Sequence, residues 1–360
     1  MRVVGAVVVL VLLLLGGAVF AGGNYIYGQN LPVETDCHDS PLFTPDGAKL
    51  RIAENPLAHQ IDPSVYDDVL RVGFPSRDPR VDIAGLYYGA GTGAPLVIAT
   101  HGYTGCKHHR HGLTILGILA SEGYSVLVID LREHGESTVI DAVAGMGSDE
   151  YADVLGAYDY AREVLNYDPG KIGFWGESMG GATTLIANTY EKLGPIFVDA
   201  PYIDIKTILK DNAYKAGVPA WSIDVMALPV QVLRGNNMTK ANPIDGLVAR
   251  PDQPIFWVHG TGDELTGVHH AEAGQKATTG MTAKKFYFAK DLGHVDTMWD
   301  EPSIYRTKLV EFFDTGRLSA LRLGPRGRRH HCGLYCWAVW CGWRCGHGAD
   351  PHRAFCLGSR

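Results

Sequence analysis

Positive charge is scarce in this chain of 360 residues, which carries 32 Lys and Arg against 39 Asp and Glu and a formal net charge of −7. A protein that binds nucleic acid needs a basic surface, and this balance does not provide one. We therefore expect no nucleic-acid partner. Cysteine is also rare in most of the chain. Of the seven cysteines, only Cys37 and Cys106 precede residue 316. These two cysteines offer the body of the protein one disulfide, in an oxidising compartment.

Charge is missing altogether from Val3–Phe20, a run of Val, Leu, Ala, Gly and one Phe that follows Arg2. Such a run enters hydrocarbon without burying a polar side chain, so we expect it to direct the chain to a membrane. Its length lies between that of a signal-peptide core and that of a full span. Residues 1–23 are thus predicted to be a cleaved signal peptide or an uncleaved membrane anchor. Either outcome exports the rest of the chain, as a secreted or membrane-anchored extracytoplasmic protein.

The C-terminal segment, residues 316–360, differs in composition from everything before it. It holds eight Arg, a single acidic residue, Asp350, and five of the seven Cys, interleaved with Trp and His. Four of these cysteines, from Cys332 to Cys345, have gaps that fit no familiar zinc site. We interpret the segment as an out-of-frame or extended reading of the coding sequence that lies outside the fold.

The body of the chain alternates strand and helix patterns. Short β-branched runs, Gly-rich turns and helical stretches repeat from about residue 69, which is typical of an α/β sheet. We predict a domain over residues 66–315, preceded by an N-terminal extension over 24–65. The predicted strands are 69–74, 81–88, 96–100, 126–130, 171–175, 196–199, 255–259 and 285–289, with the first two antiparallel. The predicted helices are 113–122, 149–165, 179–192 and 303–313.

Two further expectations concern the second half of the domain. Residues 202–250 break the alternation of strands and helices, so we predict an inserted lid there. The last helix, 303–313, is amphipathic, and its spacing predicts that Ile304, Leu309, Phe312 and Phe313 face inward.

The sequence GESMGG at residues 176–181 places Ser178 between a predicted strand and a predicted helix. A serine at the apex of so sharp a turn adopts strained backbone angles and crowds its neighbours, so the positions two residues away must lack side chains. Gly176 and Gly180 meet this requirement. The turn exposes the Ser178 hydroxyl as a nucleophile and points the Met179 N–H at the reacting oxygen.

A serine hydroxyl is a poor nucleophile at neutral pH, so it needs a base, and the base needs a carboxylate to orient it. The loop after strand 255–259 carries Asp263, and the loop after strand 285–289 carries His294. Ligands meet open α/β sheets at the carboxyl ends of the strands. Asp263 and His294 are therefore our candidates for acid and base. The alternatives are Glu264 and Asp199 for the acid, and His259, His269 and His270 for the base.

Two more loops follow central strands. HGYTG at 101–105 turns a backbone N–H toward the same point as that of Met179, so Tyr103 is our second oxyanion donor. DLREHGES at 130–137 is expected to be structural, with its charges paired near the rim of the site. CKHHRH at 106–111 groups a thiol with imidazoles, but adjacent residues do not share one helix face. We expect no metal there, and predict instead that the segment shapes the entrance of the site.

Five motifs resemble, in content and order, those of the α/β-hydrolase serine hydrolases, close to the serine aminopeptidase-like group. They are HGYTG at 101–105, DLREHGES at 130–137, GESMGG at 176–181, HGTGDE at 259–264 and GH at 293–294. The resemblance covers roughly residues 66–314. It implies the α/β-hydrolase fold, an eight-stranded, mostly parallel sheet with helices on both faces. It also implies a triad of Ser178, Asp263 and His294, backbone donors at Tyr103 and Met179, and no cofactor.

We therefore expect a serine hydrolase, of carboxylesterase or lipase type, that cleaves a small-molecule or lipid acyl substrate through an acyl-enzyme. The alternatives are a serine peptidase, an acyltransferase, and a non-catalytic binding protein with the same fold. The family acts on esters, amides and thioesters, so the resemblance names no substrate. The sequence leaves the oligomeric state open.

Overall fold

The computed structural model describes residues 10–11, 13–17, 20–21, 33, 43–215, 217, 219–224 and 240–318. Most of the apolar run, and all of the segment 319–360, lie outside these residues, so the predictions about export and the C-terminal segment remain predictions. Within the described part of the chain, no helix combines the length and the apolar character that crossing a bilayer requires.

Eight strands form a single sheet in the order β1-β2-β4-β3-β5-β6-β7-β8. The strands are β1 (Leu70–Pro75), β2 (Asp82–Tyr88), β3 (Leu96–Thr100), β4 (Ser125–Ile129), β5 (Ile172–Glu177), β6 (Ile196–Asp199), β7 (Ile255–Gly260) and β8 (Lys284–Ala289). β2 runs antiparallel to β1 and β4, and the other pairs are parallel. The predicted mostly parallel sheet of eight strands is confirmed, as is its opening antiparallel pair.

Helices connect these strands. The α-helices are α2 (Pro45–Ile52), α3 (Arg110–Ser121), α4 (Tyr151–Glu163), α5 (Ser178–Tyr190), α6 (Ile205–Lys215), α8 (Pro243–Val248), α9 (His269–Ala277), α10 (Thr297–Asp300) and α11 (Pro302–Phe313). Short 3₁₀ turns lie at η1 (Ala58–Gln60), η2 (Pro63–Asp68) and η3 (Pro169–Lys171), and a π turn, η4, covers Asp314–Leu318.

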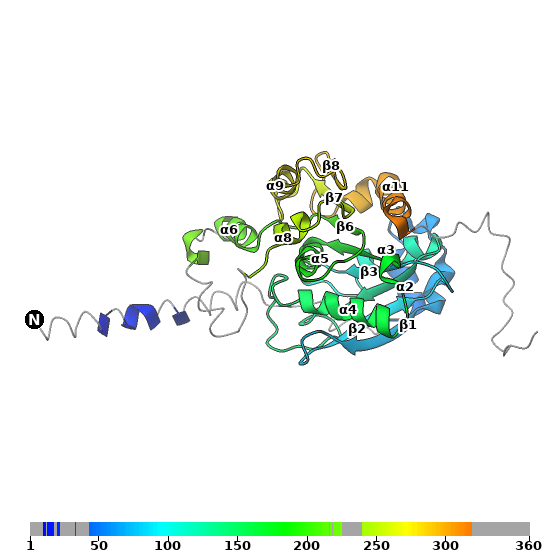
Figure 1. Cartoon of the computed structure of the whole chain (residues 1–360), viewed down its shortest axis with the longest axis horizontal. Helices are drawn as coiled ribbons and strands as arrows, with labels where there is room; N and C mark the ends of the chain where they lie inside the picture. The colour runs from blue at the N-terminus through cyan, green and yellow to red at the C-terminus, as the bar shows by residue number, and fades with distance from the viewer. Residues whose placement is uncertain are drawn as a thin grey trace, which may run out of the picture. The chain divides into compact units, whose positions relative to one another are not determined.

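Both faces of the sheet are covered by helices (Figure 1). Side chains alternate between faces along a strand, and β3 shows this directly: Leu96 and Ile98 join one hydrophobic core, whereas Val97 and Ala99 join the other. Helices α4 and α5 supply the first core, and α3 and α11 supply the second. This burial on two sides is the reason that the central strands read as uninterrupted apolar runs.

The packed core begins earlier than the predicted boundary at residue 66. Ile52, Leu57 and Ile61 are buried in the same core as α3. The contact is close, because a Cβ added at Gly117 of α3 would lie 2.3 Å from the hydroxyl of Tyr66. Residues 45–66 therefore belong to the fold, although they lack the periodic pattern of a long element.

The segment predicted as a lid, residues 202–250, divides into two parts. Helix α8 packs directly on α5, since a Cβ at Gly246 would lie 1.6 Å from Leu185 O, and Asn188 Nδ2 donates to Gly246 O at 2.8 Å. We therefore assign α8 to the helical layer of the fold. The part before it contains α6, and the lid stays a prediction for this part.

Helix α11 corrects one detail of the sequence interpretation. Leu309, Phe312 and Phe313 are buried as predicted, but Ile304 is 43% exposed. Its neighbour Tyr305 takes the inward position instead, where its hydroxyl accepts a hydrogen bond from Trp175 Nε1 at 2.9 Å. A tyrosine can be buried when its hydroxyl finds a partner.

The strand order reverses beside β3, because β4 lies on one side of it and β5 on the other. Ligands of open α/β sheets bind in the crevice at such a reversal, beyond the carboxyl ends of the strands. The loops that follow β3 and β5 are 101–109 and the turn into α5. The fold thus brings HGYTG and GESMGG to the same point.

Candidate active site

Ser178 stands at the junction of β5 and α5, where its backbone φ is 48°. This left-handed conformation is unfavourable for a residue with a side chain. The flanking glycines are required by space: a Cβ at Gly176 would lie 2.7 Å from Gly181 N, and one at Gly180 would lie 2.3 Å from His101 O. The predicted strand, sharp turn and helix are confirmed. The serine side chain is partly exposed, whereas that of the following Met179 is buried.

Asp263 and His294 are joined by a hydrogen bond of 2.7 Å between His294 Nδ1 and Asp263 Oδ2. The other carboxylate oxygen, Oδ1, accepts the N–H groups of Leu265 and Thr266, each at 2.8 Å. The Asp263 side chain is 0% exposed and that of His294 is 20% exposed. Since Nδ1–H donates to the carboxylate, Nε2 of the neutral imidazole is left as the proton acceptor.

The alternative acids occupy different environments. Glu264 is exposed. Asp199 is fully buried, and neither of its oxygens makes a well-formed hydrogen bond within the described residues. Burial, together with the negative charges of Glu177 and Asp263, raises the pKa of Asp199 well above its usual value.

The alternative histidines are committed to other partners. His259 Nδ1 accepts from Trp257 Nε1 at 3.1 Å, and its Nε2 contacts Thr266 O at 2.7 Å. With a donor on one nitrogen and an acceptor on the other, this ring has no nitrogen left to take a proton from a nucleophile. His269 and His270 lie against Asp211 of α6, at 2.9 and 3.3 Å. Of the seven candidates, Asp263 and His294 are the acid and the histidine that a hydrogen bond joins.

The loop after β3 approaches the serine closely, because a Cβ at Gly102 would lie 3.2 Å from Ser178 Cβ. Leu131 N–H donates to His101 Nε2 at 3.0 Å, which leaves the ring proton on Nδ1, and His101 Nδ1 contacts Gly102 O at 2.7 Å. The carbonyl of Gly102 and the N–H of Tyr103 belong to one trans peptide and point in opposite directions. His101 therefore helps to set the direction of the predicted oxyanion donor, together with the Gly105 N–H, which donates to the same carbonyl at 3.1 Å.

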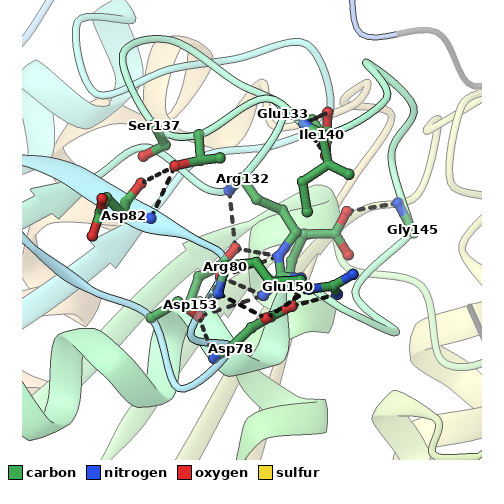
Figure 2. Close-up of polar contacts among 12 residues, drawn as sticks. Asp78, Arg80, Asp82, Arg132, Glu133, Ser137, Ile140, Gly145, Glu150 and Asp153 are labelled. Atoms are coloured by element: carbon green, nitrogen blue, oxygen red, sulfur yellow. Dashed lines mark hydrogen bonds and ion pairs between the residues drawn. The ribbon is translucent and has the colours of Figure 1, made fainter. Parts of the chain in front are cut away.

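Three of the charges of the loop after β4, those of Asp130, Arg132 and Glu136, are paired as predicted. The Glu133 carboxylate instead accepts backbone N–H groups of residues 140–142. Arg132 is the centre of one group (Figure 2), in which its guanidinium lies 2.7 Å from Asp153 Oδ1 and 3.0 Å from Asp78 Oδ2. Asp130 forms a second group, since it accepts the Lys107 N–H at 2.6 Å and is ion-paired with the Lys107 ammonium. These contacts hold the loop after β4 in place and give it a structural role.

Among the residues that the structure describes, two groups of side chains have metal-ligating atoms within 4.8 Å of one another: His109 with His111 and Glu177, and Asp211 with His269 and His270. A metal ligand needs an unprotonated nitrogen. Trp299 N–H donates to His111 Nε2, and Ile203 N–H donates to His270 Nδ1, so the nitrogen facing each carboxylate keeps its proton. This arrangement opposes metal binding, and we assign neither group to a metal.

The sequence interpretation missed a series of three residues that begins next to the serine. Glu177 precedes Ser178 directly, His111 lies on α3, and Trp299 lies on α10, and hydrogen bonds link them in series. Glu177 could have been noticed as a charge inside a buried strand.

Cys106 is the one cysteine among the described residues, and it is disulfide-bonded. Its predicted partner, Cys37, lies outside the described residues, so the pairing of these two cysteines stays a prediction.

Comparison with known proteins shows which family this chain resembles. The model of the prolyl oligopeptidase family matches residues 112–296. The putative esterase YitV of Bacillus subtilis is 30% identical over 186 residues, which cover 48% of this chain and 69% of that protein. The lysophosphatidylserine lipase ABHD12 of Xenopus tropicalis is 26% identical over 128 residues, 34% of this chain and 32% of that protein.

Solved structures show the same fold. The Pyrococcus furiosus esterase Pf2001 superposes with a TM-score of 0.58 at 21% identity, over 79% of this chain and 99% of that chain. At this identity the likeness concerns the fold alone. The family match spans just over half of the sequence, from α3 to the loop that carries His294. The chain therefore belongs to the prolyl oligopeptidase family, within the α/β-hydrolase superfamily of serine hydrolases.

Proposed function

We propose that this serine hydrolase cleaves carboxylic ester bonds through an acyl-enzyme on Ser178. The observation that carries the proposal is the 2.7 Å contact between His294 and Asp263, formed by loops at the same edge of the sheet as the Ser178 turn. A hydroxyl nucleophile needs such an oriented base.

In the proposed reaction, Ser178 Oγ attacks the ester carbonyl while His294 Nε2 takes its proton. Asp263 keeps the imidazole in the reactive tautomer and stabilises the imidazolium that forms. The backbone N–H groups of Tyr103 and Met179 hold the oxyanion. His294 then gives its proton to the departing alkoxide. Water, activated by the same base, releases the acid and restores the enzyme.

Ester cleavage is supported over other acyl chemistry by the names of the relatives. Both the Bacillus protein, a putative esterase, and the Xenopus lysophosphatidylserine lipase are named for action on esters. A small-molecule substrate follows from the same comparison, and a lipid acyl chain is one form of it.

The family name supports a second candidate, cleavage of peptide bonds. The two candidates differ in the leaving group, an alkoxide for an ester and an amine for an amide. Matched p-nitrophenyl esters and p-nitroanilides of the same acyl group therefore separate them. We expect turnover of the esters over a series of chain lengths and none of the anilides, and the reverse result would favour the peptidase.

A fluorophosphonate probe tests the nucleophile. We expect the folded wild type to be labelled, and Ser178→Ala, with thermal stability close to that of the wild type, to remain unlabelled. Failure of a folded wild type to react would overturn the proposal and favour a binding protein with the same fold.

We also propose that the protein acts outside the cytoplasm. The apolar run at Val3–Phe20 supports export, and so does the disulfide of Cys106, because disulfides persist in oxidising compartments. Fractionation of the producing cells, with alkylation of free thiols before lysis, tests this. Recovery from the cytoplasm with Cys106 reduced would overturn it.

A further inference from the structure

Glu177 is a charged residue in an unusual place. It is the last residue of β5, it is 4% exposed, and it directly precedes the proposed nucleophile, Ser178, in the sequence. Burial alone would raise the pKa of Glu177, but the hydrogen bonds that it accepts from His111 and from the Gly102 N–H oppose this effect and help to keep its pKa below the usual value. The site therefore contains a buried carboxylate beside the serine, and the proposed reaction gives it no role.

The partners of Glu177 lie on both sides of the carboxylate. Oε2 lies 2.6 Å from His111 Nδ1, and Oε1 accepts the N–H of Gly102 at 3.3 Å. The second contact reaches the oxyanion loop one residue before the predicted donor, Tyr103. Gly102 is thus held at its N–H by Glu177 and at its carbonyl by His101.

The proton on His111 is fixed by Trp299. An indole N–H is a donor and never an acceptor, and Trp299 Nε1 lies 3.0 Å from His111 Nε2. Nε2 must therefore accept, and the proton of the neutral ring is on Nδ1, where it points to Glu177. The guanidinium of Arg110 lies over the Trp299 ring at 4.4 Å from its centroid, which holds the indole in place.

We propose that His111 and Glu177 are positioning residues of the hydrolase. In this proposal, which rests on the proposed acyl-enzyme reaction, a hydrogen-bond chain from Trp299 through His111 and Glu177 to the Gly102 N–H fixes the oxyanion loop. A misplaced oxyanion donor stabilises the transition state less well, and it affects substrate binding to a smaller extent. These hydrogen bonds therefore act on kcat and leave KM nearly unchanged.

Two substitutions of His111 separate positioning from packing. His111→Asn places its amide nitrogen near the position of Nδ1 and keeps a donor for Glu177, whereas His111→Leu fills space without one. We expect kcat to fall roughly 10- to 100-fold in His111→Leu. The affinity for a trifluoromethyl ketone, whose adduct with the serine carries an oxyanion, should fall by the same factor. His111→Asn should recover most of both. The exposed His59→Leu is the matched control and should behave like the wild type.

The tautomer can be read without activity. In the folded wild type, ¹⁵N NMR should show His111 Nδ1 as the protonated nitrogen and Nε2 as the unprotonated one, and Trp299→Phe should mix the two forms. This measurement also serves if His111→Leu does not fold.

The outcomes are distinct. If the wild type is unreactive, the proposed function is wrong, and the positioning role of His111 and Glu177 is wrong with it. If the wild type is active, three results would overturn the positioning role alone: folded His111→Leu keeps full kcat, the Asn and Leu variants lose kcat equally, or the substitution changes KM instead of kcat. Protonation of His111 on Nε2 in the NMR spectrum would also overturn it.

Discussion

The Nδ1 atom of His294 lies 2.7 Å from Oδ2 of Asp263, whose second oxygen is occupied by two backbone N–H groups. This saturation leaves Asp263 one task, to orient the imidazole. In Asp263→Asn the amide can present its NH₂ group to Nδ1, which then becomes the acceptor and leaves the proton on the wrong nitrogen. We expect kcat to fall roughly 10⁴-fold, as such a substitution does in the serine protease triad.

Steady-state hydrolysis of a p-nitrophenyl ester measures this loss. The control is Glu264→Gln, which changes an exposed carboxylate next to the same loop position and should stay within about 2-fold of the wild type, since it touches no reacting group. An equal loss in both variants would mean that Asp263 is not the acid.

Arg132 is expected to contribute much of the stability of the loop after β4. Its removal in Arg132→Ala leaves the fully buried Asp153 without its counter-charge, which typically costs about 3–5 kcal/mol. Urea unfolding measures the change. Arg80→Ala is the control, because its side chain is 71% exposed and its pair with Asp78 should contribute at most about 1 kcal/mol. Similar effects of the two substitutions would contradict the assignment of Arg132 as the centre of the group.

Gly180 should tolerate no side chain. Its Cβ would meet His101 O at 2.3 Å, so Gly180→Ala must displace either the start of α5 or the oxyanion loop. Overpacking of this kind costs about 1–3 kcal/mol, and the displaced loop should also lower kcat. Gly73→Ala, on the exposed edge strand β1, meets its nearest atom at 3.8 Å and serves as control. Thermal unfolding and ester hydrolysis together check both parts.

The stability of the folded protein should depend on pH through Asp199. Burial, reinforced by the negative charges of Glu177 and Asp263, raises its pKa in the folded protein well above the unfolded value of 3.8. The folded state thus keeps a proton that the unfolded chain releases, and the stability from this group is lost as the pH rises from the unfolded pKa through the folded one. Asp199→Asn removes the titration.

Melting temperatures of Asp199→Asn and the wild type, compared at pH 5 and pH 9, test this. The difference between the two proteins should shift in favour of the Asp199→Asn variant as the pH rises, because only the wild type loses stability through this group. A difference that stays constant with pH would show that Asp199 does not keep a proton in the folded state.

The parts of the site that could be predicted from the sequence are short segments, each of which comes directly after a strand. Ser178, the loop at 101–105 and the loop that carries Asp263 each follow a strand directly, and the carboxyl ends of parallel strands share one edge. That rule needs only the identity of the strands, which the apolar runs provide.

The parts that sequence could not predict depend on how helices dock. Glu177 meets a histidine 66 positions away, and that histidine meets Trp299 another 188 positions along the chain. Nothing in the local pattern at His111 specifies where α10 will lie. The same reason explains why Ile304 was wrongly predicted to face inward. Amphipathic spacing indicates the buried face of a helix, but it does not reveal that Trp175 will provide the hydrogen bond that allows Tyr305 to be buried instead.

The register between β3 and β5 has a consequence for the spacing of the loops that follow these strands. Thr100 is paired with Gly176, and the Thr100 hydroxyl reaches both Trp175 O, at 3.2 Å, and Gly180 O, at 3.1 Å. The loops bearing Tyr103 and Ser178 therefore leave the sheet from neighbouring strands at one level, separated by the interstrand spacing of about 4.8 Å. The sheet thus fixes the spacing of these two loops, and substitutions elsewhere in the protein that leave the β3–β5 register intact should leave this spacing unchanged.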